Sequence, residues 1–340
     1  MSGERALAVV FGLPSSATLG AAEVLRTISR AAREDCTVQQ VNSLEEWEQA
    51  VSTGAPFIAL SQYPSPELRS HIEHSAVPAV MILDNPLHAM THLGSNGQQT
   101  DVGAVRAISA SFACLSDMLA LSESDILLSN TRNLAGFLVR LAEISGITPK
   151  LADLQRVETQ SHALATRLGI FGQDTLSKPV SGFLSELVVA ALPELRDVRN
   201  SDRDIRVVWP SSTFLKGDNP DTPMSSPVEL AGPSRCVLYG PYLHLLQGHW
   251  IARLTLELEG YDGYQNFAVE VVCGDVIGKG RFHCRGVGQF EVLLNFVHRR
   301  PHIPLEFRLF LNSGAICGSL TRFDVSLQRS GTDALERKTG

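Results

Sequence analysis

The sequence has few of the residue patterns that mark several common classes of protein. None of its six cysteines forms a CxxC pair, so neither a zinc knuckle nor a dense disulfide scaffold is indicated. No apolar run approaches the roughly 18 residues of a membrane span, and the run near the N-terminus is too short for a secretory signal. We therefore expect no membrane span and a cytoplasmic protein.

Basic residues are also fewer than acidic residues. The chain has 29 Lys and Arg against 36 Asp and Glu, for a formal net charge of −7. This balance argues against a general nucleic-acid-binding protein, although a local basic patch is compatible with it. What remains is a globular chain of 340 residues with 44% hydrophobic content, long enough for two domains.

Residues 1–195 alternate between short apolar runs and stretches with helical spacing. Residues 6–12 read as a buried strand, and 57–61 and 76–83 as further strands. The residues Ser43 to Glu46 form a capping-box pattern at the start of a helix. Strands that alternate with helices in this way predict an α/β domain with a largely parallel sheet.

The composition changes after residue 195, and the spacing of apolar residues changes after residue 233. Residues 196–233 are interpreted as a linker, with a charged stretch at 196–206, one short strand candidate at 206–209, and a stretch rich in Pro, Ser, Asp and Gly at 210–233. Residues 234–329 alternate with a period of two between Gly-containing turns, which predicts an antiparallel β-sandwich of jelly-roll type. Residues 330–340 are expected to be a disordered tail. The expected strands are 236–239, 249–259, 267–273, 280–284, 289–298, 305–312 and 319–328.

A small-residue loop joins the first strand to the first helix. A strand that ends in such a loop and opens a helix can hold a phosphate through free backbone N–H groups and the helix dipole. The alternative is a tight turn with a helix N-cap. The candidate binding residues are Gly12, Pro14, Ser15, Ser16, Ala17 and Thr18.

The N-terminal half resembles the sulfotransferase family in three stretches that occur in the right order: 12–18, 80–93 and 126–147. The resemblance implies a P-loop-like α/β fold and the sulfate donor 3′-phosphoadenosine 5′-phosphosulfate. Departures from the family pattern place Ser15 at a usually basic position, Ala17 at a glycine, Asp84 at an arginine and His92 at a serine. Losing two cations would cost about 3–6 kcal/mol of donor binding, so the resemblance implies a degenerate site.

Two histidines are the candidates for a catalytic role in this half. His88 and His92 are spaced i, i+4 on a predicted helix and would share one face. Transfer to a hydroxyl needs a base near the acceptor, which either residue could supply. A third metal ligand is not evident nearby, so no metal site is expected. The alternative is that both are ordinary surface or core histidines.

The C-terminal half carries aromatic and basic residues suited to sugar recognition. Flat aromatic rings pack against the C–H faces of sugars, and a few fixed polar groups surround them. The stretch 237–250 is also similar to the opening of jelly-roll modules on bacterial proteins that make or modify surface glycans. The alternative is that tyrosines are simply enriched in strands. The candidate ligand-binding residues are Tyr239, Tyr242, Trp250, Tyr261, Asp262, Tyr264, Arg299 and Arg300, the last two within a wider basic group of Lys279, Arg281, Arg285, His298, His302 and Arg308.

Three functions are compatible with this sequence. The first is a glycan-handling protein in bacterial surface polysaccharide synthesis or modification, whose sandwich binds carbohydrate beside a degenerate sulfotransferase-like domain. The second is an active sulfotransferase, or another nucleotide-donor transferase, that acts on a carbohydrate. The third is an assembly protein that binds a protein partner or its own copy and takes no ligand; a large exposed apolar patch would favour it.

Overall fold

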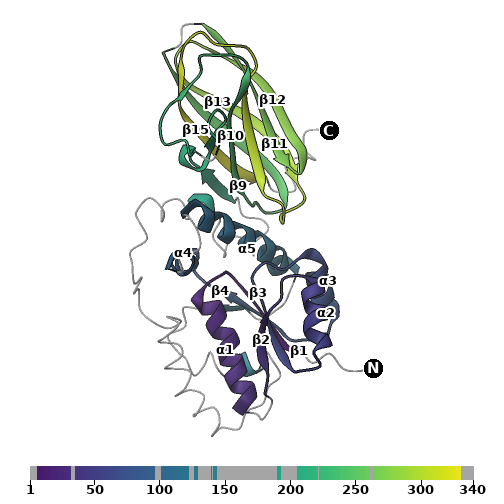
Figure 1. Ribbon diagram of the computed structural model, residues 1–340. Helices are drawn as coiled ribbons and strands as arrows, with labels where there is room; N and C mark the ends of the chain where they lie inside the picture. Colours follow the sequence, from purple (N-terminus) through teal and green to yellow (C-terminus); the bar gives the residue numbers. More distant parts are fainter. Residues whose placement is uncertain are drawn as a thin grey trace, which may run out of the picture. The chain divides into compact units, whose positions relative to one another are not determined.

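The computed structural model describes residues 6–31, 35–95, 101–121, 126–128, 139, 141–143, 190–192, 205–220, 222–260 and 263–330. The chain divides into two compact units, Met1–Ser181 and Gly182–Gly340 (Figure 1). No helix within the described ranges is both long and apolar enough to cross a membrane.

A parallel five-stranded sheet forms the centre of the N-terminal unit, as the alternating pattern predicts. Its strand order is β2-β3-β1-β4-β5, and each neighbouring pair is parallel. Strand β1 therefore lies at the centre, where a strand buried on both faces needs the near-continuous apolar run seen in its sequence. The strands are β1 Ala6–Gly12, β2 Thr37–Gln40, β3 Phe57–Ser61, β4 Ala79–Leu83 and β5 Ile126–Leu128.

Helices cover both faces of this sheet (Figure 1). Helix α1 packs its apolar face, including Leu25 and Ile28, on the side of β1 that carries Ala8 and Val10. On the other side, Trp47 of α2 meets Phe57 edge-on with 5.5 Å between ring centroids. The helices are α1 Ser16–Ala31, α2 Leu44–Ser52, α3 Pro66–His74, α4 Pro86–Ser95 and α5 Asp101–Leu121.

The predicted capping box at the start of α2 is confirmed. The Ser43 hydroxyl accepts a hydrogen bond from the Glu46 amide at 3.2 Å, and the Glu46 carboxylate accepts one from the Ser43 amide at 3.2 Å. Two of the helix's otherwise unsatisfied N–H groups are thereby paired.

The chain order in the sheet reverses at β1. After β3, which lies on one side of β1, the chain crosses to β4 on the other side. In open α/β sheets, ligands bind where the order reverses, beyond the carboxyl ends of the strands. Gly12 at the end of β1 is in register with Ile82 of β4, so the loop after Gly12 and the residues after Leu83 emerge beside each other.

Two antiparallel sheets form the C-terminal unit, and the predicted sandwich is confirmed. The first sheet has the order β13-β10-β15-β6, with β8 also paired to β15, and the second has the order β12-β11-β14-β9-β7. All ten strands are labelled here by their residues: β6 Arg206–Trp209, β7 Leu215–Lys216, β8 Val228–Glu229, β9 Arg235–Leu243, β10 Gly248–Glu259, β11 Tyr264–Cys273, β12 Asp275–Arg285, β13 Gly288–His298, β14 Leu305–Leu311 and β15 Ser319–Ser330.

The stretch interpreted as a linker, 196–233, contributes to the sandwich in its described part. Strand β6 pairs with β15, β7 with β9, and β8 with β15, while a 3-10 turn lies at Ser211–Thr213. Asp324 of β15 accepts hydrogen bonds from the Ser211 amide and hydroxyl, both at 2.9 Å. The strand expected at 206–209 is confirmed as β6, whereas the Pro- and Ser-rich composition gave no sign of β7 and β8, which have two residues each.

The sandwich core follows from strict alternation along the strands. On β11, Phe267, Val269 and Val271 are fully buried, whereas the residues between them point away from the core. The rings of Phe307 and Trp209 meet edge-on in the same core at 5.8 Å. We call the side of β12, β11, β14 and β9 that points away from the core the outer face of the second sheet.

Candidate functional site

The loop that resembles a phosphate-binding loop is closed by its own side chains. Ser15 and Thr18 are both fully buried, and their hydroxyl oxygens lie 3.3 Å apart. The Ser15 hydroxyl also accepts a hydrogen bond from the Thr18 amide at 3.4 Å. A Cβ added to Gly12 would lie 2.7 Å from Thr18 Cγ2, so the threonine packs directly on the glycine. This arrangement is that of a helix N-cap.

The surroundings of this loop carry negative rather than positive charge. The loop from Gly12 to Thr18 has no Lys or Arg. Asp84, which follows the adjacent strand β4, is 2% exposed and accepts a hydrogen bond from the Asn85 amide at 2.8 Å. Inward-facing hydroxyls and a buried carboxylate do not fit an anionic donor such as 3′-phosphoadenosine 5′-phosphosulfate. Binding of that donor stays a prediction for titration.

The two candidate catalytic histidines lie near Asp84. His88 Nδ1 is 3.0 Å from an Asp84 carboxylate oxygen, and the His88 side chain is 45% exposed. Burial lowers the pKa of His92, and the charge of Asp84 partly opposes that shift. A half-exposed imidazole that a carboxylate holds in place can act as a general base. The i, i+4 spacing of Asp84 and His88 was a signal for this pair that sequence reasoning missed. Within the described ranges, no group of three His, Cys, Asp or Glu side chains could hold a metal.

Three of the predicted ligand-binding tyrosines lie on the outer face of the second sheet. Tyr264, at the start of β11, is 57% exposed. The Arg285 guanidinium carbon lies 5.3 Å from the centre of its ring, and the His283 ring centre is 6.3 Å away. A cation at this distance is attracted by the ring's negative face. Tyr264 is therefore an accessible aromatic surface with a basic group beside it.

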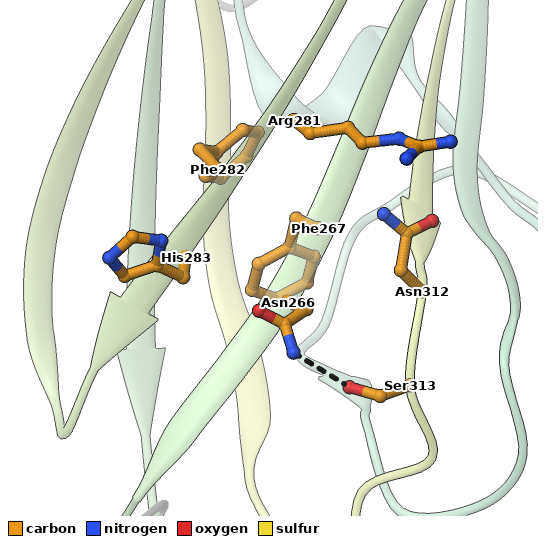
Figure 2. Close-up of a pocket in the computed structure, with 7 residues that line it drawn as sticks. All are labelled: Asn266, Phe267, Arg281, Phe282, His283, Asn312 and Ser313. Atoms are coloured by element: carbon orange, nitrogen blue, oxygen red, sulfur yellow. Dashed lines mark hydrogen bonds between the residues drawn. The ribbon is translucent and has the colours of Figure 1, made fainter.

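A hollow of about 300 Å³ lies next to Tyr264 in the second sheet (Figure 2). The Asn266 side-chain amide donates a hydrogen bond to the Ser313 hydroxyl at 3.4 Å, and the Asn312 backbone amide donates to the Asn266 carbonyl at 2.9 Å. These bonds fix the polar rim of the hollow. The side chains of Arg281 and Asn312 make no hydrogen bond or ion pair with any described residue. The lining residues are Asn266, Phe267, Arg281, Phe282, His283, Asn312 and Ser313.

The other end of the same face holds Tyr239 and Tyr242. Their ring centres are 6.2 Å apart, and the Tyr242 hydroxyl donates a hydrogen bond to Glu306 at 3.0 Å. Burial, followed by the charge of Glu306, raises the pKa of Tyr242 to about 12. Arg308 donates to the same carboxylate at 2.7 Å. The expected strand ended at residue 239, but the chain continues through both tyrosines as β9.

Register places the two aromatic groups at opposite ends of one face. Tyr239 is opposite Arg308, which in turn is opposite Glu270 of β11. Glu270 is six positions from Tyr264 on the same strand, or about 20 Å at the usual strand rise. The face is therefore elongated, with an aromatic group at each end.

Trp250 does not belong to this face. It is 1% exposed, and its indole N–H donates a hydrogen bond to the Leu246 carbonyl at 2.9 Å. The even-numbered positions of β10 point into the core, as Leu254 and Leu256 do, and Trp250 shares their parity. No ring face is available to a sugar there. Two further candidates, Tyr261 and Asp262, lie outside the described residues.

The two candidate arginines lie in the loop after β13, far along the sandwich from Tyr264. Arg300 donates to an Asp275 carboxylate oxygen at 3.0 Å and to the Cys273 carbonyl, so it ties this loop to the turn between β11 and β12. Arg299 is exposed and borders a second hollow of about 310 Å³ together with His298. The structure does not bring either arginine to Tyr264, since Cys273 is at the opposite end of β11.

Comparison with known proteins gives likenesses in fold only. No family model matches the chain, and no curated protein matches it. Among solved structures, the CBM36-1 domain of a multidomain xylanase from the hindgut metagenome of Trinervitermes trinervoides is 12% identical, with a TM-score of 0.27, covering 37% of this chain and 99% of that one. A carbohydrate-binding module CBM36 in complex with calcium and xylotriose is 16% identical, with a TM-score of 0.23, covering 35% and 97%.

Proteins of another kind match equally well. The structure of infectious bursal disease virus Gx strain is 10% identical, with a TM-score of 0.23, covering 39% of this chain and 33% of that one. At such identities and TM-scores, none of these likenesses carries an argument about what the chain binds. The structure of the chain itself defines the class: a parallel α/β unit followed by an antiparallel β-sandwich.

Proposed function

We propose that the C-terminal sandwich binds carbohydrate on the outer face of the second sheet, around Tyr264. The observation that carries this proposal is the 57% exposed Tyr264 ring beside a hollow lined by the side chains of Arg281 and Asn312, which make no hydrogen bond with any described residue. An exposed aromatic ring packs against the C–H face of a sugar. Guanidinium and amide groups then bond to its hydroxyls and fix its orientation.

The length of the face supports an oligosaccharide rather than a single sugar. Tyr264 is at one end, and Tyr239 is at the other, about 20 Å away by strand rise. An extended chain of several rings can lie along such a surface and use both aromatic groups. Tyr242 contributes less in this proposal, because its hydroxyl is already bonded to Glu306.

The test is calorimetric titration of the full chain with a panel of oligosaccharides. Tyr264→Ala should weaken the binding of any ligand found by about five- to thirty-fold, the equivalent of about 1–2 kcal/mol. Tyr264→Phe keeps the ring and should bind like the parent. Leu293→Ala is the matched control, because Leu293 is 61% exposed on the outward side of the first sheet. No binding at millimolar oligosaccharide, or equal affinity of Tyr264→Ala and the parent, would refute the proposal.

For the α/β unit we propose a scaffolding role in the same glycan-handling protein. The inward hydroxyls of Ser15 and Thr18 and the buried Asp84 beside them favour this role over a donor-binding transferase. The Asp84–His88 pair is the one observation that favours the transferase. A setting in bacterial surface polysaccharide synthesis or modification stays a prediction from the sequence. So does a protein partner or homo-oligomer, which light scattering of the purified chain would test.

A further inference from the structure

The outward side chains of the edge strand beside the proposed site are basic, and this bears on the kind of carbohydrate the site takes. Building on the proposed function, we propose that the ligand is an acidic glycan, whose carboxylate or sulfate groups are bound by strand β12. The residues that carry this inference are Lys279, Arg281, His283 and Arg285, which we call the β12 strip.

The four residues of the β12 strip point to the same side because alternate residues of a strand share a face. Strand β12 has one hydrogen-bonded neighbour, β11, and the four strip residues occupy alternate positions. All four are exposed. In register, Arg285 is opposite Tyr264, His283 opposite Asn266, Arg281 opposite Ala268 and Lys279 opposite Glu270. Arg285 of the strip therefore lies beside Tyr264, and Arg281 and His283 line the hollow.

Most other arginines of the sandwich are already neutralised by a carboxylate. Arg253 and Arg308 show the usual arrangement, with carboxylate oxygens at 2.6 and 2.7 Å. In the described part of the chain, by contrast, no ion pair within 4 Å involves Lys279, Arg281 or Arg285. The paired set is Arg235–Asp218, Arg253–Glu291, Arg300–Asp275, Arg308–Glu306 and Arg322–Asp324.

Cations that point the same way and make no ion pair produce a local positive potential. Glu270, in register with Lys279, reduces this potential at one end, so Arg281 and Arg285 carry most of it. The potential is local because the chain as a whole has a net charge of −7. Charged residues on an edge strand also protect a sheet against pairing with another chain. That protection requires neither a single sign of charge nor a hollow beside it, and the β12 strip has both.

Arg281, in the middle of the strip, can bind an acidic group in the hollow. Arg281 lines it together with Asn266 and Asn312 (Figure 2). A guanidinium presents two parallel N–H groups that match the two oxygens of a carboxylate or sulfate. The asparagine amides can then bond to neighbouring hydroxyls, which makes the hollow selective for a charged sugar over a simple anion. Alternate residues of a strand are about 7 Å apart, so Lys279 and Arg285 can meet further charges along the chain.

The experiment compares acidic oligosaccharides with the same oligosaccharides after their charge has been removed. The probes are oligogalacturonate, hyaluronate and sulfated oligosaccharides, each beside its methyl-esterified, carboxyl-reduced or desulfated form, titrated into the full chain by calorimetry. We expect an acidic member to bind and its neutral form to bind at least ten-fold more weakly. Raising the salt from 0.1 to 1 M should weaken only the acidic member, because the screening length falls from about 10 to about 3 Å.

Variants separate this inference from the proposed function. Arg281→Gln should weaken the acidic ligand about 10- to 100-fold, the range expected for a charge-assisted bidentate contact. Arg206→Gln removes the same charge from the exposed side of β6 in the first sheet and should have no effect. Binding of neutral oligosaccharides alone, weakened by Tyr264→Ala but not by Arg281→Gln, would overturn the acidic specificity and leave the proposed function standing. No binding by any member would overturn both. Equally tight binding of polyglutamate or single-stranded DNA would show a general anion surface and overturn the glycan assignment.

Discussion

The stability of the sandwich should depend on pH through one buried histidine. His298 ends β13 with no exposed surface, and burial lowers the pKa of its imidazole to about 4. The Leu245 backbone opposes this shift, while the nearby His244, Arg300 and His302 add to it. In the unfolded chain the same imidazole titrates at the ordinary value of about 6.5. Between these two values the unfolded chain binds a proton that the folded chain does not.

The direction and size of the change in stability with pH follow from this difference in pKa. Stability is fully present above about pH 6.5 and is lost as the pH falls toward 4, because protonation favours the unfolded chain. At pH 4.5 the loss from His298 alone is about 2.5 kcal/mol. Burial also lowers the pKa of His244, which adds to the loss in the same direction.

The assay is urea unfolding followed by tryptophan fluorescence at pH 7.5 and 4.5. Trp47→Phe in every sample leaves Trp209 and Trp250, both buried in the sandwich, as the reporters. Carboxylates also titrate in this range, so the parent is compared with His298→Gln, which keeps every group but the imidazole. The variant should lose about 2–3 kcal/mol less than the parent between the two pH values. Parallel losses in the two proteins would refute the reasoning, whatever the variant's stability at pH 7.5.

Two further predictions concern the loop after β1. Titration with 3′,5′-adenosine bisphosphate should show no binding at millimolar concentration, because the Ser15 and Thr18 hydroxyls face each other and Asp84 lies beside the loop; micromolar binding that is lost when Thr18 is replaced by a bulky residue would contradict this. Gly12→Ala should lower the free energy of unfolding of the α/β unit by about 1–3 kcal/mol through overpacking, since a Cβ there would lie 2.7 Å from Thr18 Cγ2 and 3.0 Å from the Ile82 carbonyl oxygen. Thermal unfolding followed by circular dichroism measures that effect, and an unchanged midpoint for Gly12→Ala would contradict it.

Periodicity predicted most of the fold because burial alternates wherever a sheet has one buried face. Strand β10 was expected at 249–259 and lies at Gly248–Glu259, and β13 was expected at 289–298 and lies at Gly288–His298. Strand β6 was expected at 206–209 and lies there, but β7 and β8 were missed, because two residues are too few for a period to show. Much of the last part of the predicted α/β domain, residues 151–195, lies outside the described residues.

The candidate site was predicted less completely, because a site depends on which strands become neighbours. Composition alone grouped Trp250 with the tyrosines, although the parity of β10 places its ring in the core. The basic residues were counted as one cluster, but pairing separates Lys279, Arg281 and Arg285, which lack carboxylate partners among the described residues, from Arg300 and Arg308, which have them. Residue order along the chain does not determine such cross-strand partners.

Along β12, the residues that hold the core alternate with the residues that form the surface. Gly280, Phe282 and Cys284 face inward, and the Phe282 ring stacks on Phe267 with 5.6 Å between centroids. The four residues of the β12 strip alternate with these positions and point outward, away from the core. Substitutions at the outward positions therefore change the charge and shape of the surface while the core contacts stay the same. If the proposed function holds, single mutations at these four positions should alter the preferred ligand, and a library varied there should preserve the fold.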